Sequence, residues 1–102
     1  MNIYPIEDKQ GKLHAFEIEN WKTGRSKTVK IIKGIPEVII LREPKRFLSW
    51  FREEVFCEFK INETIFQIEE FYGDNSRYWI GKKEEGGWCR ELELVKKVFQ
   101  AS

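Results

Sequence analysis

The sequence is poor in the residues on which many active sites depend, with one histidine, two cysteines and three prolines. The single imidazole of His14 and the isolated thiols of Cys57 and Cys89 make a poor zinc site, and no C-x-x-C or H-E-x-x-H motif occurs. Gly86-Gly87 lacks the Lys and the Ser or Thr that follow in a phosphate-binding loop. The sequence therefore predicts no metal site and no bound cofactor.

Long hydrophobic runs are also missing. The longest aliphatic run, at 38–41, is far below the roughly 20 residues that a membrane-spanning helix needs. Residues 1–10 include Glu7 and Asp8 and contain no apolar stretch of signal-peptide length. Because the two cysteines show no disulfide framework, we expect a reduced, cytoplasmic protein with no membrane association.

The chain has no excess of one charge. Eighteen Lys and Arg stand against seventeen Asp and Glu, for a net charge of +1, with a basic first half and an acidic second half. This balance gives no long-range reason to expect nucleic acid or an anionic membrane as partner. Nucleic-acid binding is a minority hypothesis, and it depends on one side of a predicted helix that carries Lys27, Lys30 and Lys33. A lysine-lined helix side is more often a solvated surface than a contact for phosphates.

Aromatic side chains are plentiful: four Trp, eight Phe and three Tyr among 102 residues. They bury the large areas that a small domain needs for stability. No repeat, low-complexity tract or linker divides the sequence, so we expect a single domain over residues 1–102.

The hydrophobic pattern predicts an α+β fold: a mostly antiparallel sheet of about five strands, ending in a C-terminal three-strand meander, with two helices packed on one face. A first helix is expected to follow Ser26 as N-cap and to end at Gly34. A closing helix is expected to bury the stripe Trp88, Leu92, Val95 and Phe99. The segment 45–53 fits a short helical turn or an irregular loop. Strand-like segments, the first of them a short edge strand, lie at 3–6, 13–20, 38–41, 55–61, 64–71 and 77–81.

A two-residue turn at Asn62-Glu63 sets the register of a central hairpin. The resulting core-facing pairs are Ile61 with Thr64, Phe59 with Phe66, Cys57 with Ile68, and Val55 with Glu70. The run at 38–41 is expected to form a buried strand.

The opposite side of the hairpin combines aromatic and charged residues, as protein-binding surfaces do. Glu58 and Glu69 would lie diagonally and form an ion pair with Arg77, or else act together on a cation or a proton. The alternative is that the N-terminal segment or residues 45–53 cover this side. The candidate binding residues are Phe56, Glu58, Glu69, Phe71, Arg77 and Trp79.

The leading hypothesis is therefore a non-catalytic domain that binds another protein, or a second copy of itself, through this surface. The main alternative is a thiol-dependent enzyme or redox protein. Cys89 is expected at the start of the closing helix, where backbone amides can activate a thiol, and His14 is the one candidate base. Cys89 also fits a small buried residue beside Trp88, and His14 fits a hydrogen-bonded residue at the boundary of the core.

Overall fold

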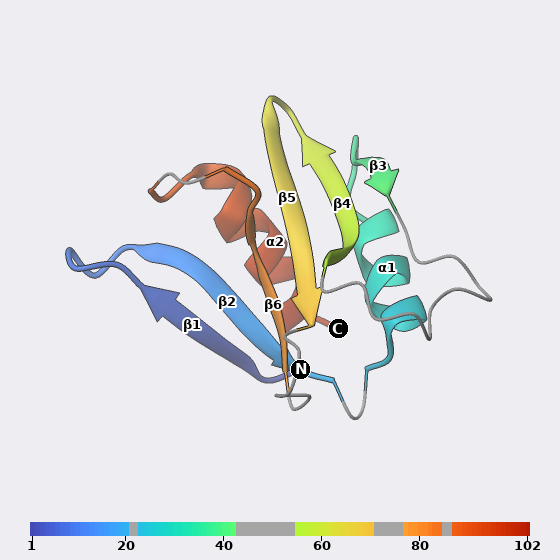
Figure 1. Cartoon of the computed structure of the whole chain (residues 1–102), viewed down its shortest axis with the longest axis horizontal. Helices are drawn as coiled ribbons and strands as arrows, with labels where there is room; N and C mark the ends of the chain where they lie inside the picture. Colours follow the sequence, from blue (N-terminus) through green and yellow to red (C-terminus); the bar gives the residue numbers. More distant parts are fainter. Residues whose placement is uncertain (21–22, 43–54, 71–76, 85–86) are drawn as a thin grey trace.

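The computed structural model describes residues 1–20, 23–42, 55–70, 77–84 and 87–102. Within these residues lies a sheet of six strands in the order β1-β2-β6-β5-β4-β3, in which every neighbouring pair is antiparallel (Figure 1). The elements are β1 (Ile3–Glu7), β2 (Leu13–Glu19), α1 (Arg25–Lys33), β3 (Ile39–Arg42), β4 (Val55–Ile61), β5 (Thr64–Glu70), β6 (Arg77–Lys82) and α2 (Arg90–Gln100). The predicted α+β class and the meander are confirmed, with six strands in place of about five.

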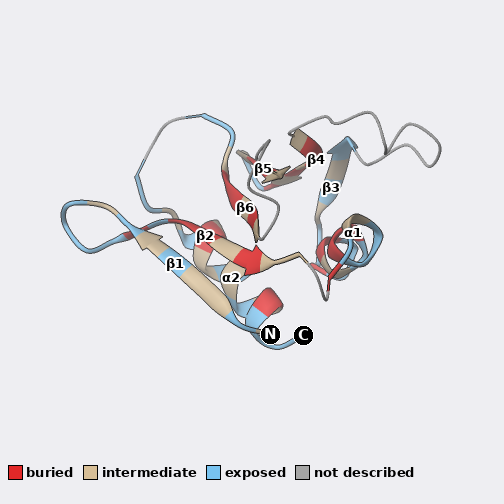
Figure 2. Cartoon of the chain, turned by 60° about the horizontal axis from the view of Figure 1, so that its bottom comes forward, coloured by how far each residue is buried: buried red, intermediate tan, exposed pale blue. Residues whose placement is uncertain are grey.

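The two helices pack on one face of the sheet and close the hydrophobic core, as predicted. α1 contacts α2 and β4, and α2 contacts β1 and β2. The Phe99 ring on α2 packs edge-on against Phe16 of β2, with 5.8 Å between ring centroids. The strands contribute further buried residues on this face, coloured red in Figure 2: Ile18, Cys57, Phe59, Phe66, Ile68 and Ile80.

The helix boundaries differ slightly from those predicted. α1 begins after Gly24, not Ser26, and the Thr28 hydroxyl donates to the Gly24 carbonyl oxygen at 2.9 Å. The predicted end at Gly34 is confirmed. α2 buries Leu92, Val95 and Phe99 as predicted, but Trp88 precedes the helix and is 45% exposed, with its indole nitrogen donating to Glu93 at 3.0 Å. The apolar stripe therefore starts one turn later than expected.

The two edges of the sheet are formed by β1 and β3. The predicted edge strand at 3–6 is confirmed, with Pro5 at its centre. The prediction of a buried strand at 38–41 is wrong, because β3 is the outermost strand on its side. Ile39 is 55% exposed and Leu41 is 48% exposed. Val38 and Ile40 alone from this run pack against the core.

The central hairpin has the predicted register near its turn, where Ile61 pairs with Thr64. Asn62 has φ +54°, a left-handed conformation that Asn tolerates in tight turns. Farther from the turn the register shifts, so that Val55 pairs with Glu69 and not with Glu70. A β-bulge between Val55 and Cys57 causes the shift, and bulges turn a side chain to the other face of a sheet.

The bulge corrects the predicted place of Phe56. Phe56 is 1% exposed and lies on the helix side of the sheet. Its ring packs against the ring of Tyr78, with 4.9 Å between the two centroids. The Arg25 guanidinium of α1 lies 4.6 Å from the ring centroid. Phe56 is therefore a core residue and does not belong to the opposite face. Phe71 and the segment 45–53 lie outside the described residues.

Replacing Phe56 by Ala should destabilise the protein by about 3 to 5 kcal/mol, because the change leaves a cavity beside Tyr78. The matched control is Trp88→Ala, which removes an exposed aromatic ring and should cost less than about 1 kcal/mol. Urea unfolding followed by circular dichroism measures both. Equal costs for the two variants would contradict the buried position of Phe56.

Candidate functional site: the open face of the sheet

The face of the sheet away from the helices is formed by residues that pair directly across the strands. Paired residues of antiparallel strands project on the same side, so they form rows across a sheet. One row holds Tyr4, Glu17, Trp79, Glu69 and Val55, and the next holds Ile6, Ala15, Gly81, Gln67 and Glu58. We call these two rows, together with the paired residues Glu19 and Arg77, the open face.

Trp79 is the largest side chain of the open face, and its position is fixed by the small residues next to it. A Cβ atom placed on Gly81 would lie 2.5 Å from Cη2 and 2.7 Å from Cζ2 of the indole. The same position is 3.1 Å from the Cβ of Ala15, which is fully buried. The indole therefore lies over Gly81 and beside Ala15, while Trp79 itself remains partly exposed.

A second cluster joins β1, β2 and β6 beside Trp79. The Arg77 guanidinium carbon lies 3.6 Å from the centroid of the Tyr4 ring, and its Nη1 is 3.4 Å from a Glu17 carboxylate oxygen. The Tyr4 hydroxyl donates a hydrogen bond to Glu19. This bond is the main reason that the pKa of Tyr4 is raised, because ionisation would break it. Arg77 is thus held between an aromatic ring and a carboxylate.

The remaining charged residues of the open face pair differently from the prediction. Glu58 accepts a hydrogen bond from Lys83 at 2.9 Å and lies 3.9 Å from Arg42. Gln67 donates to Glu69. Arg77 pairs with Glu17 of β2 and not with a carboxylate of the hairpin. Glu58 and Glu69 lie in neighbouring rows, as predicted, but each has its own partner.

Glu58, Glu69, Arg77 and Trp79 lie on the face that the sequence predicted for them, and the structure adds three neighbours that the prediction did not include: Tyr4, Glu17 and Glu19. The alternating pattern of β2 in the sequence already indicated that Glu17 and Glu19 lie on the side opposite Phe16. No sequence signal indicates that β2 pairs with β6, about 60 positions away. Without this pairing, neither carboxylate could be assigned to the same surface as Trp79.

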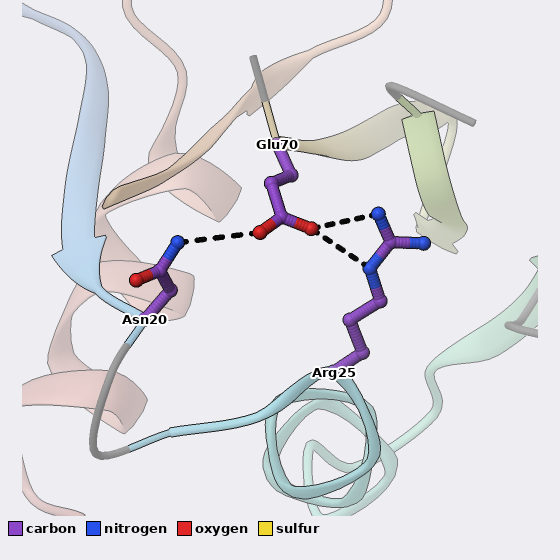
Figure 3. A network of polar contacts seen from close by, with 3 residues as sticks. All are labelled: Asn20, Arg25 and Glu70. Carbon is purple, nitrogen blue, oxygen red and sulfur yellow. Dashed lines mark hydrogen bonds and ion pairs between the residues drawn. The ribbon is translucent and has the colours of Figure 1, made fainter. Parts of the chain in front are cut away.

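A polar network lies on the other side of the sheet, between α1 and β5 (Figure 3). Arg25 donates to one Glu70 oxygen through Nε at 3.0 Å and Nη2 at 2.7 Å, and Asn20 donates to the other at 3.3 Å. Both charged side chains are mostly buried, at 17% and 23% exposed. The network anchors the first turn of α1 to the end of β5, with Arg25 over Phe56. We assign it a structural role.

Burial raises the pKa of Tyr78, next to this network, to about 12. The negative charge of Glu70 acts in the same direction, and Arg25 opposes it. Tyr78 is 3% exposed, so its neutral form belongs to the folded core.

The residues of the thiol hypothesis are not joined in the structure. Cys89 is the N-cap of α2, as predicted, and is partly exposed, but acidic Glu91 and Glu93 occupy the first turn. His14 is exposed on β2, and among the described residues no hydrogen bond joins it to Cys89. Cys57 is buried in the core.

The three lysines of the nucleic-acid hypothesis are all exposed on α1: Lys27, Lys30 and Lys33.

In the described part of the chain, no three His, Cys, Asp or Glu side chains are grouped to hold a metal ion. No helix there has both the length and the hydropathy to cross a membrane. A pocket of about 280 Å³ includes Lys27 of the nucleic-acid hypothesis and Glu19 of the open face, and is lined by Met1, Asn2, Glu19, Thr23, Lys27 and Ser102.

Comparisons of the chain with protein-family models, with curated proteins and with solved structures found no match. Function is therefore inferred from the open face.

Gly81→Ala should displace the Trp79 indole and destabilise the protein by about 1 to 3 kcal/mol, because the new methyl group occupies the space of the ring. In a Trp79→Ala background the same change should cost clearly less, because the indole is gone and only the 3.1 Å approach to the Cβ of Ala15 remains. Urea unfolding of the four proteins gives the coupling energy. Additive effects would show that Trp79 does not lie over Gly81.

The buried Tyr78 predicts a loss of stability at high pH. In the unfolded chain a tyrosine ionises near pH 10, whereas Tyr78 in the folded protein ionises near 12. The unfolded state therefore loses its proton first, and stability falls as pH rises from about 10 to about 12, by up to about 2 kcal/mol. Urea unfolding of the protein and of Tyr78→Phe across this range isolates the effect from lysine titration. Parallel pH profiles of the two proteins would contradict the assignment.

Proposed function

We propose that the chain is a small, non-catalytic domain that binds another protein through the open face. The observation that carries this proposal is the position of Trp79, whose indole is fixed over Gly81 while part of it remains accessible on a face that neither helix covers. Trp, Tyr and Arg are the side chains that most often dominate the binding energy of protein interfaces. The open face carries one of each in neighbouring positions: Tyr4, Arg77 and Trp79.

The contacts around these three side chains support a binding role because they reduce the cost of association. Arg77 is held by the Tyr4 ring and by Glu17, and Tyr4 is held by Glu19. Side chains that are ordered before binding lose less conformational freedom when a partner arrives. The open face is therefore organised in advance, in contrast to a surface of free lysines and glutamates.

The charges of the open face indicate the chemistry of the partner. Directly around Trp79 the carboxylates of Glu17, Glu19 and Glu69 outnumber the guanidinium of Arg77, whereas Glu58, farther along the sheet, is paired with Lys83 and Arg42. The local excess of negative charge beside the indole favours a partner that presents Lys or Arg there, and an indole also attracts such cations. The same carboxylates oppose the phosphate backbone of a nucleic acid. We therefore expect a protein partner with a basic contact surface.

Trp79→Ala should weaken binding of the partner at least about 30-fold, as expected for the loss of a dominant interface residue. The partner is isolated by affinity capture from lysate of the source cells with nuclease present, and is then purified and titrated by calorimetry. Glu69→Lys is a second variant that reverses one charge of the open face while leaving the core unchanged. It should also weaken binding.

The matched control is Trp88→Ala, which removes a partly exposed indole outside the open face and should leave the dissociation constant unchanged. Sedimentation of the purified chain alone tests whether the partner is a second copy. The proposal would be overturned by a captured protein that binds Trp79→Ala and Trp88→Ala equally well, or by the absence of any partner that depends on the open face.

A further inference from the structure

One row of the open face alternates aromatic rings and carboxylates. From β1 across β2 and β6 to β5, the row reads Tyr4, Glu17, Trp79 and Glu69. Directly paired residues of antiparallel strands have Cβ atoms about 4.5 to 5.5 Å apart, so each ring has a carboxylate within reach. The row therefore contains the same combination twice, a ring followed by a carboxylate.

The first of these combinations holds a guanidinium. The Arg77 guanidinium carbon lies 3.6 Å from the centroid of the Tyr4 ring, and its Nη1 lies 3.4 Å from a Glu17 carboxylate oxygen. The ring attracts the cation through its π electrons, and the carboxylate attracts it through its charge. The chain itself thus shows which chemical group a ring and a carboxylate accept on this face.

The second combination holds no such cation. Within the described ranges, no guanidinium or ammonium lies over the Trp79 ring, and no other aromatic ring packs against it. The indole is fixed over Gly81 and remains partly exposed. Because an indole attracts cations more strongly than a phenol ring does, its accessible part suits a cation from outside the chain.

The carboxylate beside this indole is already oriented. Gln67 donates a hydrogen bond to Glu69, and Glu69 has a further contact as well. A carboxylate offers about four lone-pair sites on two oxygen atoms, so it accepts additional donors without losing the first. Glu69 therefore does not need to be unpaired in order to accept a hydrogen bond from a cation on Trp79.

The shape of the vacant position favours arginine over lysine. A guanidinium is planar, stacks on aromatic rings and presents N–H groups at its edge, as Arg77 does between Tyr4 and Glu17. A lysine ammonium is a compact, strongly hydrated charge without a flat surface. A ring with a carboxylate beside it therefore matches a guanidinium more completely.

We propose that Trp79 and Glu69 form a subsite for one arginine side chain of the partner protein. The guanidinium lies on the accessible part of the indole and donates to the Glu69 carboxylate. This inference rests on the proposed function, because it names the chemical group by which the open face recognises its partner.

An NMR titration with blocked arginine tests the subsite. N-acetyl-arginine amide carries the guanidinium as its one charge, and the indole N–H signals of the isotope-labelled chain are assigned with Trp79→Phe and Trp88→Phe. The Trp79 signal should shift saturably, with a dissociation constant of about 10 to 100 mM, as expected for one cation on a ring beside a carboxylate. N-acetyl-citrulline amide has the same planar shape without the charge and should bind at least about fivefold more weakly.

Trp88 is the matched control within the same spectrum. Its indole is 45% exposed, but its N–H donates to Glu93, and Lys96 lies 3.5 Å from that carboxylate. The Trp88 signal should shift at least about fivefold less than that of Trp79, because a lysine already offsets the nearby negative charge. Glu69→Gln should weaken arginine binding at Trp79 at least about threefold, whereas Glu93→Gln should leave it unchanged.

Equal affinities for the arginine and citrulline amides, equal shifts at Trp79 and Trp88, or unchanged binding by Glu69→Gln would each overturn the subsite. The proposed function fails by a different result. A captured partner that is lost with Trp79→Ala, together with no response of Trp79 to blocked arginine, would overturn the arginine subsite alone. Binding of blocked arginine at Trp79 without any partner that depends on the open face would overturn the proposed function alone.

Discussion

The position of β6 between β2 and β5 is the constraint on which both faces of the sheet depend. On the helix side, this position sets Ile80 between Phe16 and Ile68, and all three are fully buried. On the open side, the same pairings set Trp79 between Glu17 and Glu69. Core packing therefore fixes the register of β6, and the register fixes which side chains surround Trp79. A shift of one residue would exchange the two faces.

Small and large residues are matched along the open face in a way that gives Trp79 a single position. The indole covers Gly81 and Ala15, so a bulky aromatic ring lies close to the backbone without projecting fully into solvent. Beside it, Arg77 is ordered by Tyr4 and Glu17. Such ordering is costly on a surface without use, since side-chain entropy is lost with little burial in return. We interpret it as preparation for binding.

The two ends of the sheet complement this face. At one end, β1 contributes Tyr4 to the open face and Pro5 to a protected edge. At the other end, β3 leaves Ile39 and Leu41 exposed on an edge without proline. β1 thus completes the open face, and β3 forms an exposed apolar edge.

Local sequence determined the helices, the meander and the register near Asn62, because periodicity and turn chemistry act between residues close in the chain. It also indicated that Trp79, Arg77 and Glu69 lie opposite the core. Only the tertiary structure decided the strand order, and this order brought Tyr4, Glu17 and Glu19 to Trp79 and exposed β3. The bulge that turned Phe56 into the core was likewise beyond local reasoning, since packing against Tyr78 and Arg25 outweighed strict alternation.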